Sequence, residues 1–277
     1  MSQDLDFPAR DGLRLRGTLF SPRGSPKARI VIGSAMGVAR GYYAPFAAAL
    51  AEAGALVLSF DYRGIGDSEA PDSSSLTDWG DRDLAGAFDA LAARAPDAPE
   101  RYLGHSVGGQ LLGFVENLRA DRAVFVASQS GYYANWEGLG VAVMLGVWSI
   151  GIPLSLAISG RLPMKRFGQG EDVPAGVAAQ WARWGRRPGY LWSDAMARGG
   201  ASFLAWRGQL ETIAITDDRY APPRSIRALT EMYRSAYIKL VEIAPSDIGA
   251  SAIGHFGFFR RRHASTLWPR AIQSLLG

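Results

Sequence analysis

Short, mainly apolar runs alternate along the chain with longer segments that have the composition of helices. Apolar runs bounded by turn residues are typical of buried strands, and here they lie at residues 29–32, 55–60, 101–103, 122–127, 211–216 and 237–243. The helix-like segments between and after them lie at residues 43–53, 76–93, 110–115, 223–233 and 267–276. This alternation predicts an α/β fold, with a mostly parallel, doubly wound sheet flanked by helices.

The N-terminal region has a different pattern. Apolar residues recur at every second position of Leu13–Phe20, which is the period of a strand, and Asp11-Gly12 before it is a turn signal. We therefore expect Leu5–Phe7 and Leu13–Phe20 to form a hairpin at the start of the sheet.

The alternation breaks between Gln129 and Ala205, which predicts an inserted, mainly helical cap (129–205) on a core formed by residues 1–128 and 206–277. No charged residue occurs from Gly138 to Gly160, a stretch long enough to span a membrane but interrupted by Pro153 and several glycines. We interpret this stretch as a buried or pocket-lining helix pair, with contact to a membrane surface as the alternative. The cap is expected to roof an apolar pocket, with substrate-binding side chains at Trp136, Trp148, Trp181 and Trp184.

The clearest chemical motif is Gly104-His105-Ser106-Val107-Gly108-Gly109, which follows a short strand and opens a helix. In that context a G-x-S-x-G sequence forms a nucleophile elbow, because a serine on so sharp a turn needs neighbours with almost no side chain. Ser106 is therefore the candidate nucleophile.

The chain has three histidines, so the search for a base is short. His255 lies in a glycine-flanked loop after the last strand and is the candidate general base. His105, beside the candidate nucleophile, is expected to be packed in the interior, and His263, after three arginines, is expected at the surface.

An acid that orients the base should lie between the serine and the histidine along the chain. Asp217 and Asp218 follow the strand at residues 211–216, and their side chains point in different directions, so only one of them can reach His255. We favour Asp218 and keep Asp217 as the alternative. Asp247 is a weaker candidate.

An oxyanion hole needs two backbone N–H groups directed at the developing negative charge. Val107, directly after the nucleophile, is the first expected donor. The second is expected from the loop after the strand at residues 29–32, at Ala35 or Met36.

Composition narrows the chemistry. The net charge of +4 comes almost wholly from scattered arginines, so no nucleic-acid partner is expected. Cysteine is absent and no cluster of His and acidic residues suggests a metal site, so neither a metal nor a cofactor is expected. The acidic N-terminus lacks the apolar run of a signal peptide, which favours a cytoplasmic protein. We expect a small-molecule ester as substrate and do not favour contact with a membrane. The sequence leaves the oligomeric state open.

The chain resembles the α/β-hydrolase superfamily along nearly its whole length. The resemblance rests on the Gly104–Gly109 elbow, the Asp61–Ser68 turn, Asp217-Asp218 and Gly254-His255. It implies the chain order Ser106, Asp218, His255 and a structural role for Asp61 in its turn. The usual His-Gly pair before the oxyanion loop is replaced here by Gly33-Ser34-Ala35-Met36-Gly37.

Three further stretches look like a bacterial subgroup of predicted hydrolases, similar to the serine-aminopeptidase-like and monoglyceride-lipase-like branch. They are residues 41–43, 180–184 and 254–260. The resemblance implies the fold and the triad but almost nothing about the substrate. The leading interpretation is a serine hydrolase acting on an ester. An amidase, a peptidase or an acyltransferase would use the same residues, and a non-catalytic binding module on this scaffold is the alternative from another class. All three triad positions are filled, which argues against the binding module.

Overall fold

The computed structural model describes residues 1–277 except Asp72, Asn117, Gln169 and Gly199. The described residues form one sheet of eight strands in the order β1-β2-β4-β3-β5-β6-β9-β10. The first two strands are antiparallel to each other and β2 is antiparallel to β4, whereas all other neighbours are parallel. The strands are β1 (Ser2–Pro8), β2 (Arg14–Phe20), β3 (Ala28–Gly33), β4 (Ala55–Phe60), β5 (Glu100–His105), β6 (Arg122–Val126), β9 (Gln209–Ile215) and β10 (Tyr237–Ile243). The predicted N-terminal hairpin and mostly parallel sheet are confirmed.

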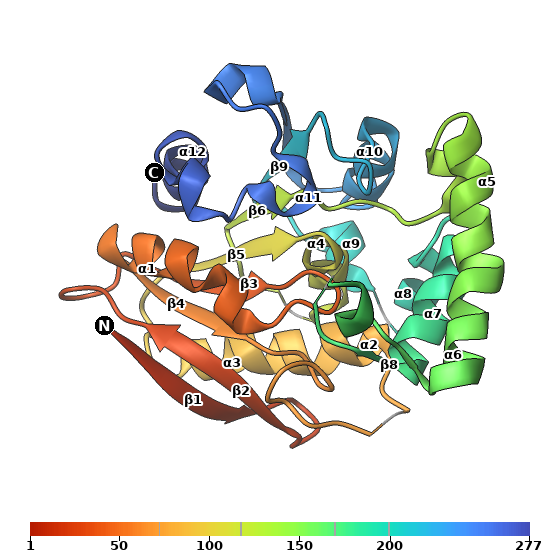
Figure 1. Ribbon diagram of the computed structural model, residues 1–277. Helices are drawn as coiled ribbons and strands as arrows, with labels where there is room; N and C mark the ends of the chain where they lie inside the picture. Colours follow the sequence, from red (N-terminus) through yellow and green to blue (C-terminus); the bar gives the residue numbers. More distant parts are fainter. Residues whose placement is uncertain (72, 117, 169, 199) are drawn as a thin grey trace.

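Helices cover both faces of the sheet, as the alternating pattern predicts (Figure 1). On one face α1 (Ala44–Glu52) and α12 (Ala264–Leu276) bury Phe46 and Trp268 against Ile30 and Ile32 of β3. On the other face lies a continuous helical segment formed by α2 (Leu76–Asp78), a π-helical turn (Trp79–Leu84) and α3 (Ala85–Ala92). Short helices α4 (Val107–Leu111), α10 (Pro223–Thr230) and α11 (Gly254–Gly257) lie next to the carboxyl ends of the strands, where side chains of several strands converge.

The Asp61–Ser68 turn is held by ion pairs. Asp61, which is fully buried, pairs with Arg40 from the short helix before α1. Arg63 forms two salt bridges, one to the buried Asp83 and one to Asp11 in the N-terminal hairpin. These contacts are consistent with the structural role that the family resemblance implies for Asp61.

Between β6 and β9 the chain forms a mainly helical layer beyond the carboxyl ends of the strands (Figure 1). Its elements are α5 (Leu139–Gly146), a π-helical turn (Val147–Gly151), α6 (Ile152–Ser159), β7 (Arg161–Leu162), β8 (Val173–Pro174), α7 (Ala175–Gly185), α8 (Trp192–Ala197) and α9 (Ala201–Ala205). The antiparallel pair β7–β8 was not predicted, because two-residue strands leave almost no periodic pattern. We call residues 129–205 the cap.

The charge-free stretch differs from its prediction. It forms one continuous helix, Leu139–Ser159, instead of a buried or pocket-lining pair of helices. Only 11% of the most apolar 18 residues of this helix are buried. One face packs on the cap through Trp148 and Ile152, and no described element covers the opposite face. By length and composition alone, this is also the one described helix that is apolar enough to cross a membrane.

His263 is also placed differently from its prediction. The arginine run before it suggests the surface, but His263 is only 6% exposed, because it lies where the chain enters α12. Burial and the neighbouring Arg262, whose Nε donates to His263 Nε2, lower the pKa of this histidine.

Candidate active site

Ser106 occupies a sharp turn between β5 and α4. Its backbone angles are φ 53° and ψ −115°, a conformation that non-glycine residues rarely adopt and that is found where function requires strain. The turn leaves no room for side chains on the neighbouring glycines. A Cβ atom on Gly108 would lie 2.2 Å from the carbonyl oxygen of Gly33, and one on Gly104 would lie 2.7 Å from the amide nitrogen of Gly109. Close packing of β3, β5 and α4 therefore accounts for the glycines of the motif.

The two backbone segments expected to supply an oxyanion hole meet at this turn. Val107 is the first residue of α4, so its N–H has no partner within the helix. Gly33, the last residue of β3, pairs with Gly104 of β5, which brings the loop after β3 to the elbow.

The structure separates the two candidates for the second donor. The N–H of Ala35 donates to the buried Oη of Tyr43 over 2.8 Å, so it is not free to bind an oxyanion. This corrects the expectation for Ala35, because the sequence alone gave no sign that Tyr43 reaches this loop. Met36 stays the proposed donor.

His255 and Asp218 form a buried pair. Nδ1 of His255 lies 2.7 Å from Oδ2 of Asp218, and the two side chains are 7% and 0% exposed. The other carboxylate oxygen of Asp218 accepts hydrogen bonds from the N–H groups of Tyr220 and Ala221, at 2.8 and 3.2 Å. These contacts fix the carboxylate, and the carboxylate in turn fixes the orientation of the imidazole.

The other two acidic candidates make different contacts. Asp217 accepts hydrogen bonds from the N–H groups of Ile253 and Gly254, each over 3.0 Å, so it holds the loop that carries His255 rather than the ring itself. Asp247, in the turn Pro245–Ile248, accepts a hydrogen bond from the N–H of Ala244, the residue before that turn. Of the three acids, Asp218 is the one whose carboxylate contacts the His255 imidazole.

The backbone of His255 accepts a hydrogen bond from His105, the residue before Ser106. Nε2 of His105 donates to the carbonyl oxygen of His255 over 2.9 Å, and the two imidazole rings are 5.1 Å apart. His255 therefore lies beside the elbow, and Ser106 and His255 are 6% and 8% exposed. Among the described residues no hydrogen bond joins the Ser106 hydroxyl to the His255 ring, so the role of His255 as base stays a proposal.

His105 is fully buried, as expected, and its ring is bonded at both nitrogens. Because Nε2 donates to a carbonyl, Nδ1 is the unprotonated nitrogen and accepts the hydroxyl proton of Tyr43 over 2.8 Å. Burial lowers the pKa of His105 well below its usual value, which keeps the ring neutral, and burial raises the pKa of the Tyr43 phenol. A chain of hydrogen bonds thus connects the N–H of Ala35, through Tyr43 and His105, to the backbone of His255.

The sequence model of the Alpha/beta hydrolase family matches residues 25–264, which is most of the chain. The chain belongs to the Alpha/beta hydrolase family. No curated protein matches it by sequence.

Solved structures of esterases and lipases share the fold. An esterase of Pyrococcus furiosus is similar at 15% identity and a TM-score of 0.67, over 100% of this chain and 92% of that one. A monoacylglycerol lipase of Paleococcus ferrophilus is similar at 14% identity and a TM-score of 0.61, over 95% and 98%. DcsB, solved with a substrate analogue, is similar at 14% identity and a TM-score of 0.66, over 99% and 98%. At these identities the likeness shows the fold alone.

The four cap tryptophans of this hydrolase have separate structural surroundings. Trp136 donates from its indole nitrogen to the carbonyl of Arg219, next to Asp218, and so ties the cap to the acid loop. Trp184 is fully buried and stacks on Phe114. Its interior packing does not support the predicted contact with substrate.

The other two tryptophans form an edge-to-face pair. The rings of Trp148 and Trp181 are 4.7 Å apart. The indole nitrogen of Trp181 donates to Tyr190, whose hydroxyl donates to Gln110 on the helix that follows Ser106. The indole nitrogen of Trp148 is buried without a partner among the described residues. Trp148 is 2% exposed, so its packing does not support the predicted contact with substrate either, whereas Trp181 stays a candidate. Tyr43, Gln110 and Tyr190 were not predicted, since a single tyrosine or glutamine carries no motif signal.

A cavity of about 300 Å³ adjoins the candidate site through Phe256, whose ring lies 5.0 Å from the His255 ring, while Ser106 itself does not line the cavity. It is lined on one side by Val38, Ala39 and Tyr42, which follow the oxyanion loop, and on the other by Phe256 and Arg260, which follow His255. The cap loop at Gly170 and Glu171 forms its margin, and the N–H of Glu171 donates to the carbonyl of Gly37 over 2.6 Å. A hydrogen bond therefore joins the cap directly to the loop that carries Met36.

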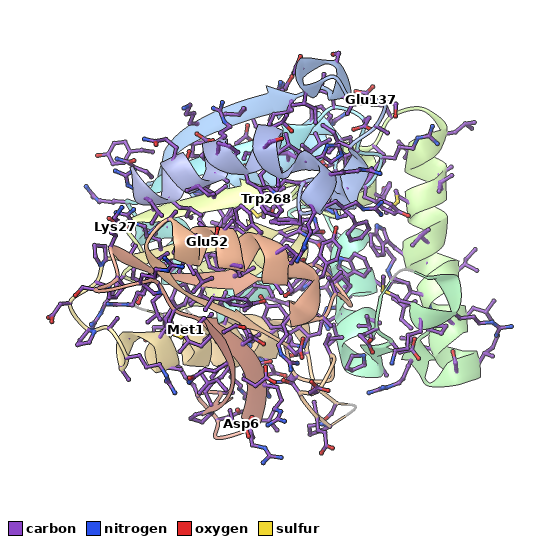
Figure 2. All side chains as sticks on the ribbon, turned by 60° about the vertical axis from the view of Figure 1, so that its left-hand side comes forward. Met1, Asp6, Lys27, Glu52, Glu137 and Trp268 are labelled. Atoms are coloured by element: carbon purple, nitrogen blue, oxygen red, sulfur yellow. The ribbon has the colours of Figure 1, made fainter. Side chains whose placement is uncertain are left out.

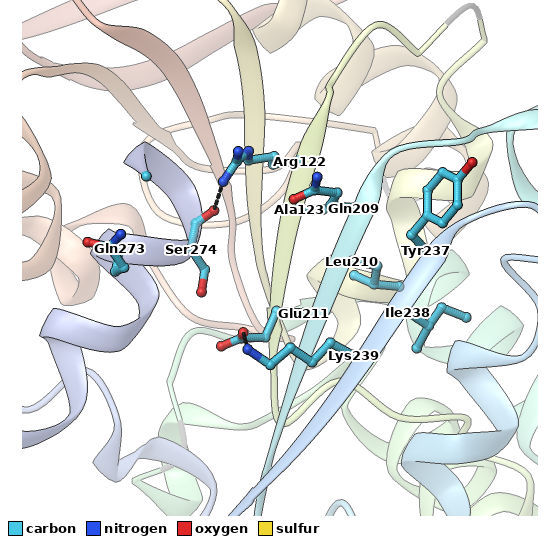
Figure 3. A pocket seen from close by; sticks show the side chains of 11 residues that line it. Arg122, Ala123, Gln209, Leu210, Glu211, Tyr237, Ile238, Lys239, Gln273 and Ser274 are labelled. Atoms are coloured by element: carbon cyan, nitrogen blue, oxygen red, sulfur yellow. Dashed lines mark hydrogen bonds and ion pairs between the residues drawn. The ribbon is translucent and has the colours of Figure 1, made fainter.

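A second cavity, of about 740 Å³, lies away from this site (Figure 3). It is lined by the first residues of β6, β9 and β10, including Arg122, Gln209 and Lys239. Since these strands are parallel to β5, their amino ends lie at one end of the strands, and Ser106, which follows the carboxyl end of β5, lies at the other. This cavity does not belong to the candidate active site. In the described part of the chain, no group of three His, Asp or Glu side chains is arranged to hold a metal ion.

Proposed function

We propose that this Alpha/beta hydrolase is a serine hydrolase that cleaves a carboxylic ester through Ser106, His255 and Asp218. One combination of observations carries the proposal: Ser106 has the strained backbone of a nucleophile elbow, and the buried His255–Asp218 pair is bonded to the residue beside it. Each observation alone has a structural explanation, but a nucleophile, a base and an orienting acid in one place fit acyl transfer.

In the proposed reaction the Ser106 hydroxyl attacks the ester carbonyl while His255 accepts its proton. Asp218 stabilises the imidazolium that forms, and the N–H groups of Val107 and Met36 bind the oxyanion of the tetrahedral intermediate. His255 then gives its proton to the oxygen of the leaving group. The alcohol departs, and the acyl group stays bound to Ser106. Water, activated by the same histidine, attacks the acyl carbonyl and releases the acid.

We propose an apolar acyl group because most of the side chains around the neighbouring cavity are apolar or aromatic: Val38, Ala39, Tyr42 and Phe256. Two of the structural neighbours are an esterase and a monoacylglycerol lipase, which agrees with an ester substrate. Each buried methylene contributes about 0.8 kcal/mol, so each added carbon should raise kcat/KM by up to about fourfold until the pocket is filled.

An active-site probe tests the nucleophile. A fluorophosphonate should label the wild-type protein, and Ser106→Ala should abolish labelling while the far-UV and near-UV circular dichroism stay unchanged. Ser246→Ala, at an exposed serine in a turn, is the matched control and should be labelled like the wild type. Labelling that persists in Ser106→Ala would refute the assignment.

A substrate series tests the bond and the acyl group. Rates on p-nitrophenyl esters should rise from acetyl toward medium-chain acyl groups and exceed those on the corresponding p-nitroanilides. Highest activity on the acetyl ester would contradict the apolar acyl pocket, and faster cleavage of the anilides would favour an amidase.

A further inference from the structure

The outward face of the Leu139–Ser159 helix is an exposed aliphatic stripe. Leu139, Val143, Val147, Ile150, Leu154 and Ile158 recur every three or four residues, which places them on one side of the helix. Their exposed fractions are 86%, 60%, 36%, 66%, 55% and 77%. The helix forms one margin of the molecule (Figures 1 and 2). A contiguous apolar surface of this kind marks a contact with a partner or with lipid.

The helix lies along the cap and does not project from it. Trp148 and Ile152 on its inner side are buried, and the Trp148 indole fits against Gly185 of α7, where a Cβ atom would lie within 2.5 Å of the ring. Both ends of the helix connect directly to other cap elements, through the turn at Tyr133–Asn135 and through β7. A helix held in this way can enter a bilayer surface with its outer side but cannot cross the bilayer, unless the cap unfolds.

The positive net charge of the cap favours binding to an anionic surface. Residues 129–205 contain seven arginines and lysines and four acidic residues, so the cap carries +3 of the net +4 of the whole chain. Arg166, shortly after the helix, and Arg186 and Arg187, at the end of α7, are exposed. Gly185 contacts Trp148 on the inner side of the helix, so Arg186 and Arg187 follow α7 on that side. An aliphatic stripe on a cap of net positive charge matches the acyl chains and the negative head groups of an anionic bilayer.

A second copy of the chain fits the same surface less well. In a symmetric dimer across this helix, each cap would face an identical cap of net charge +3, and like charges at close range oppose association. Lipid head groups of negative charge remove that repulsion.

We propose that the hydrolase docks on anionic lipid bilayers through the outward stripe of Leu139–Ser159, with the helix parallel to the membrane plane. This binding does not require Ser106, so it can be tested independently of the proposed ester hydrolysis. It takes up the alternative that the sequence left for this stretch, contact with a membrane surface.

The test is co-sedimentation of the full-length Ser106→Ala protein with vesicles, which measures binding without turnover. Vesicles of phosphatidylglycerol and phosphatidylcholine should bind it at least tenfold better than vesicles of phosphatidylcholine alone, and added salt should reduce binding. Ile150→Glu combined with Leu154→Glu should lower binding tenfold or more. The matched control is Ile238→Glu in β10, a 43% exposed isoleucine at the opposite end of the sheet, which should bind like the parent protein.

Thermal unfolding of each variant establishes that it is folded. The proposal is overturned if the parent protein does not bind anionic vesicles, if it binds neutral vesicles equally well, or if the stripe variant binds like the Ile238→Glu control. It is also overturned if sedimentation velocity shows a dimer that Ile150→Glu dissociates, because the stripe is then an interface between copies of the chain. None of these outcomes bears on labelling of Ser106, so failure here is distinguishable from failure of the proposed catalytic function.

Discussion

His105 donates a hydrogen bond from Nε2 to the backbone carbonyl of His255 over 2.9 Å. The other nitrogen of His105 accepts the Tyr43 hydroxyl, which itself accepts the N–H of Ala35. The elbow, the loop after β3 and the loop that carries the proposed base are therefore joined by one buried chain of hydrogen bonds. In this chain His105 is a positioning residue, since it contacts the backbone of the base and not the substrate.

Replacing His105 by Phe should lower kcat about tenfold with little change in KM. Phenylalanine keeps a ring of similar size but removes the hydrogen bond to the His255 carbonyl. A hydrogen bond of this kind is worth about 1.4 kcal/mol, and the rate falls about tenfold when that whole amount is added to the activation free energy. His105→Gln retains an N–H donor and should restore most of the rate. Kinetics on a p-nitrophenyl ester measure both variants, and a His105→Gln enzyme as slow as His105→Phe would contradict the positioning role.

Stability should fall on acidification because of His105. Its pKa is well below 6.5 in the folded protein, so below pH 6.5 the unfolded chain binds a proton that the folded chain does not. Above pH 6.5 both states carry a neutral His105, so this residue makes the free energy of unfolding no lower there. Below pH 6.5 the free energy of unfolding should decrease by up to about 1.4 kcal/mol per pH unit. Urea unfolding at pH 7, 6 and 5 measures this slope. His105→Gln should reduce the slope but not abolish it, because the pKa of His263 is lowered too. An unchanged slope in that variant would contradict this source.

The sheet could be predicted from the sequence because buried parallel strands read as short apolar runs, such as residues 55–60, which are buried throughout. The elbow could be predicted because its steric demand is local: Gly104 and Gly108 have no alternative at their packing distances. Only one of two adjacent side chains can reach the base, and Asp218 could be favoured because it stands four residues before Pro222, in the loop after the strand. The contact between Asp218 and His255 agrees with that choice.

Contacts between distant segments could not be predicted. Tyr43 occupies the N–H of Ala35 only because α1 packs beside the β3 loop, and no local pattern encodes that meeting. The cap helix was expected to be buried because it has no charge, but hydropathy records composition and not how many neighbours surround a helix. His263 is buried for the complementary reason, since tertiary packing outweighed the three arginines that precede it.

Asp218 and Asp217 should differ sharply when each is changed to asparagine. Asp218→Asn removes the negative charge that stabilises the His255 imidazolium, and the equivalent change in a Ser-His-Asp triad lowers kcat by about 10⁴-fold. Asp217→Asn keeps one acceptor for the N–H groups of Ile253 and Gly254 and should cost less than about tenfold. Steady-state kinetics on the same ester compare the two. Equal losses would show that loop anchoring, and not charge on the imidazole, dominates.

Gly108→Ala should both destabilise the protein and abolish labelling by a fluorophosphonate. The added Cβ would lie 2.2 Å from the carbonyl oxygen of Gly33, a backbone atom that can move only if β3 and α4 separate. Overpacking of this kind costs about 1–3 kcal/mol or more of the free energy of unfolding, and the separation would also displace the loop that carries Met36. Gly41→Ala is the matched control, because Gly41 is exposed and a Cβ atom there meets nothing within 4 Å. Urea unfolding and probe labelling should leave Gly41→Ala near the wild type. If Gly108→Ala is as stable and as reactive as Gly41→Ala, close packing at the elbow is not what requires the glycine.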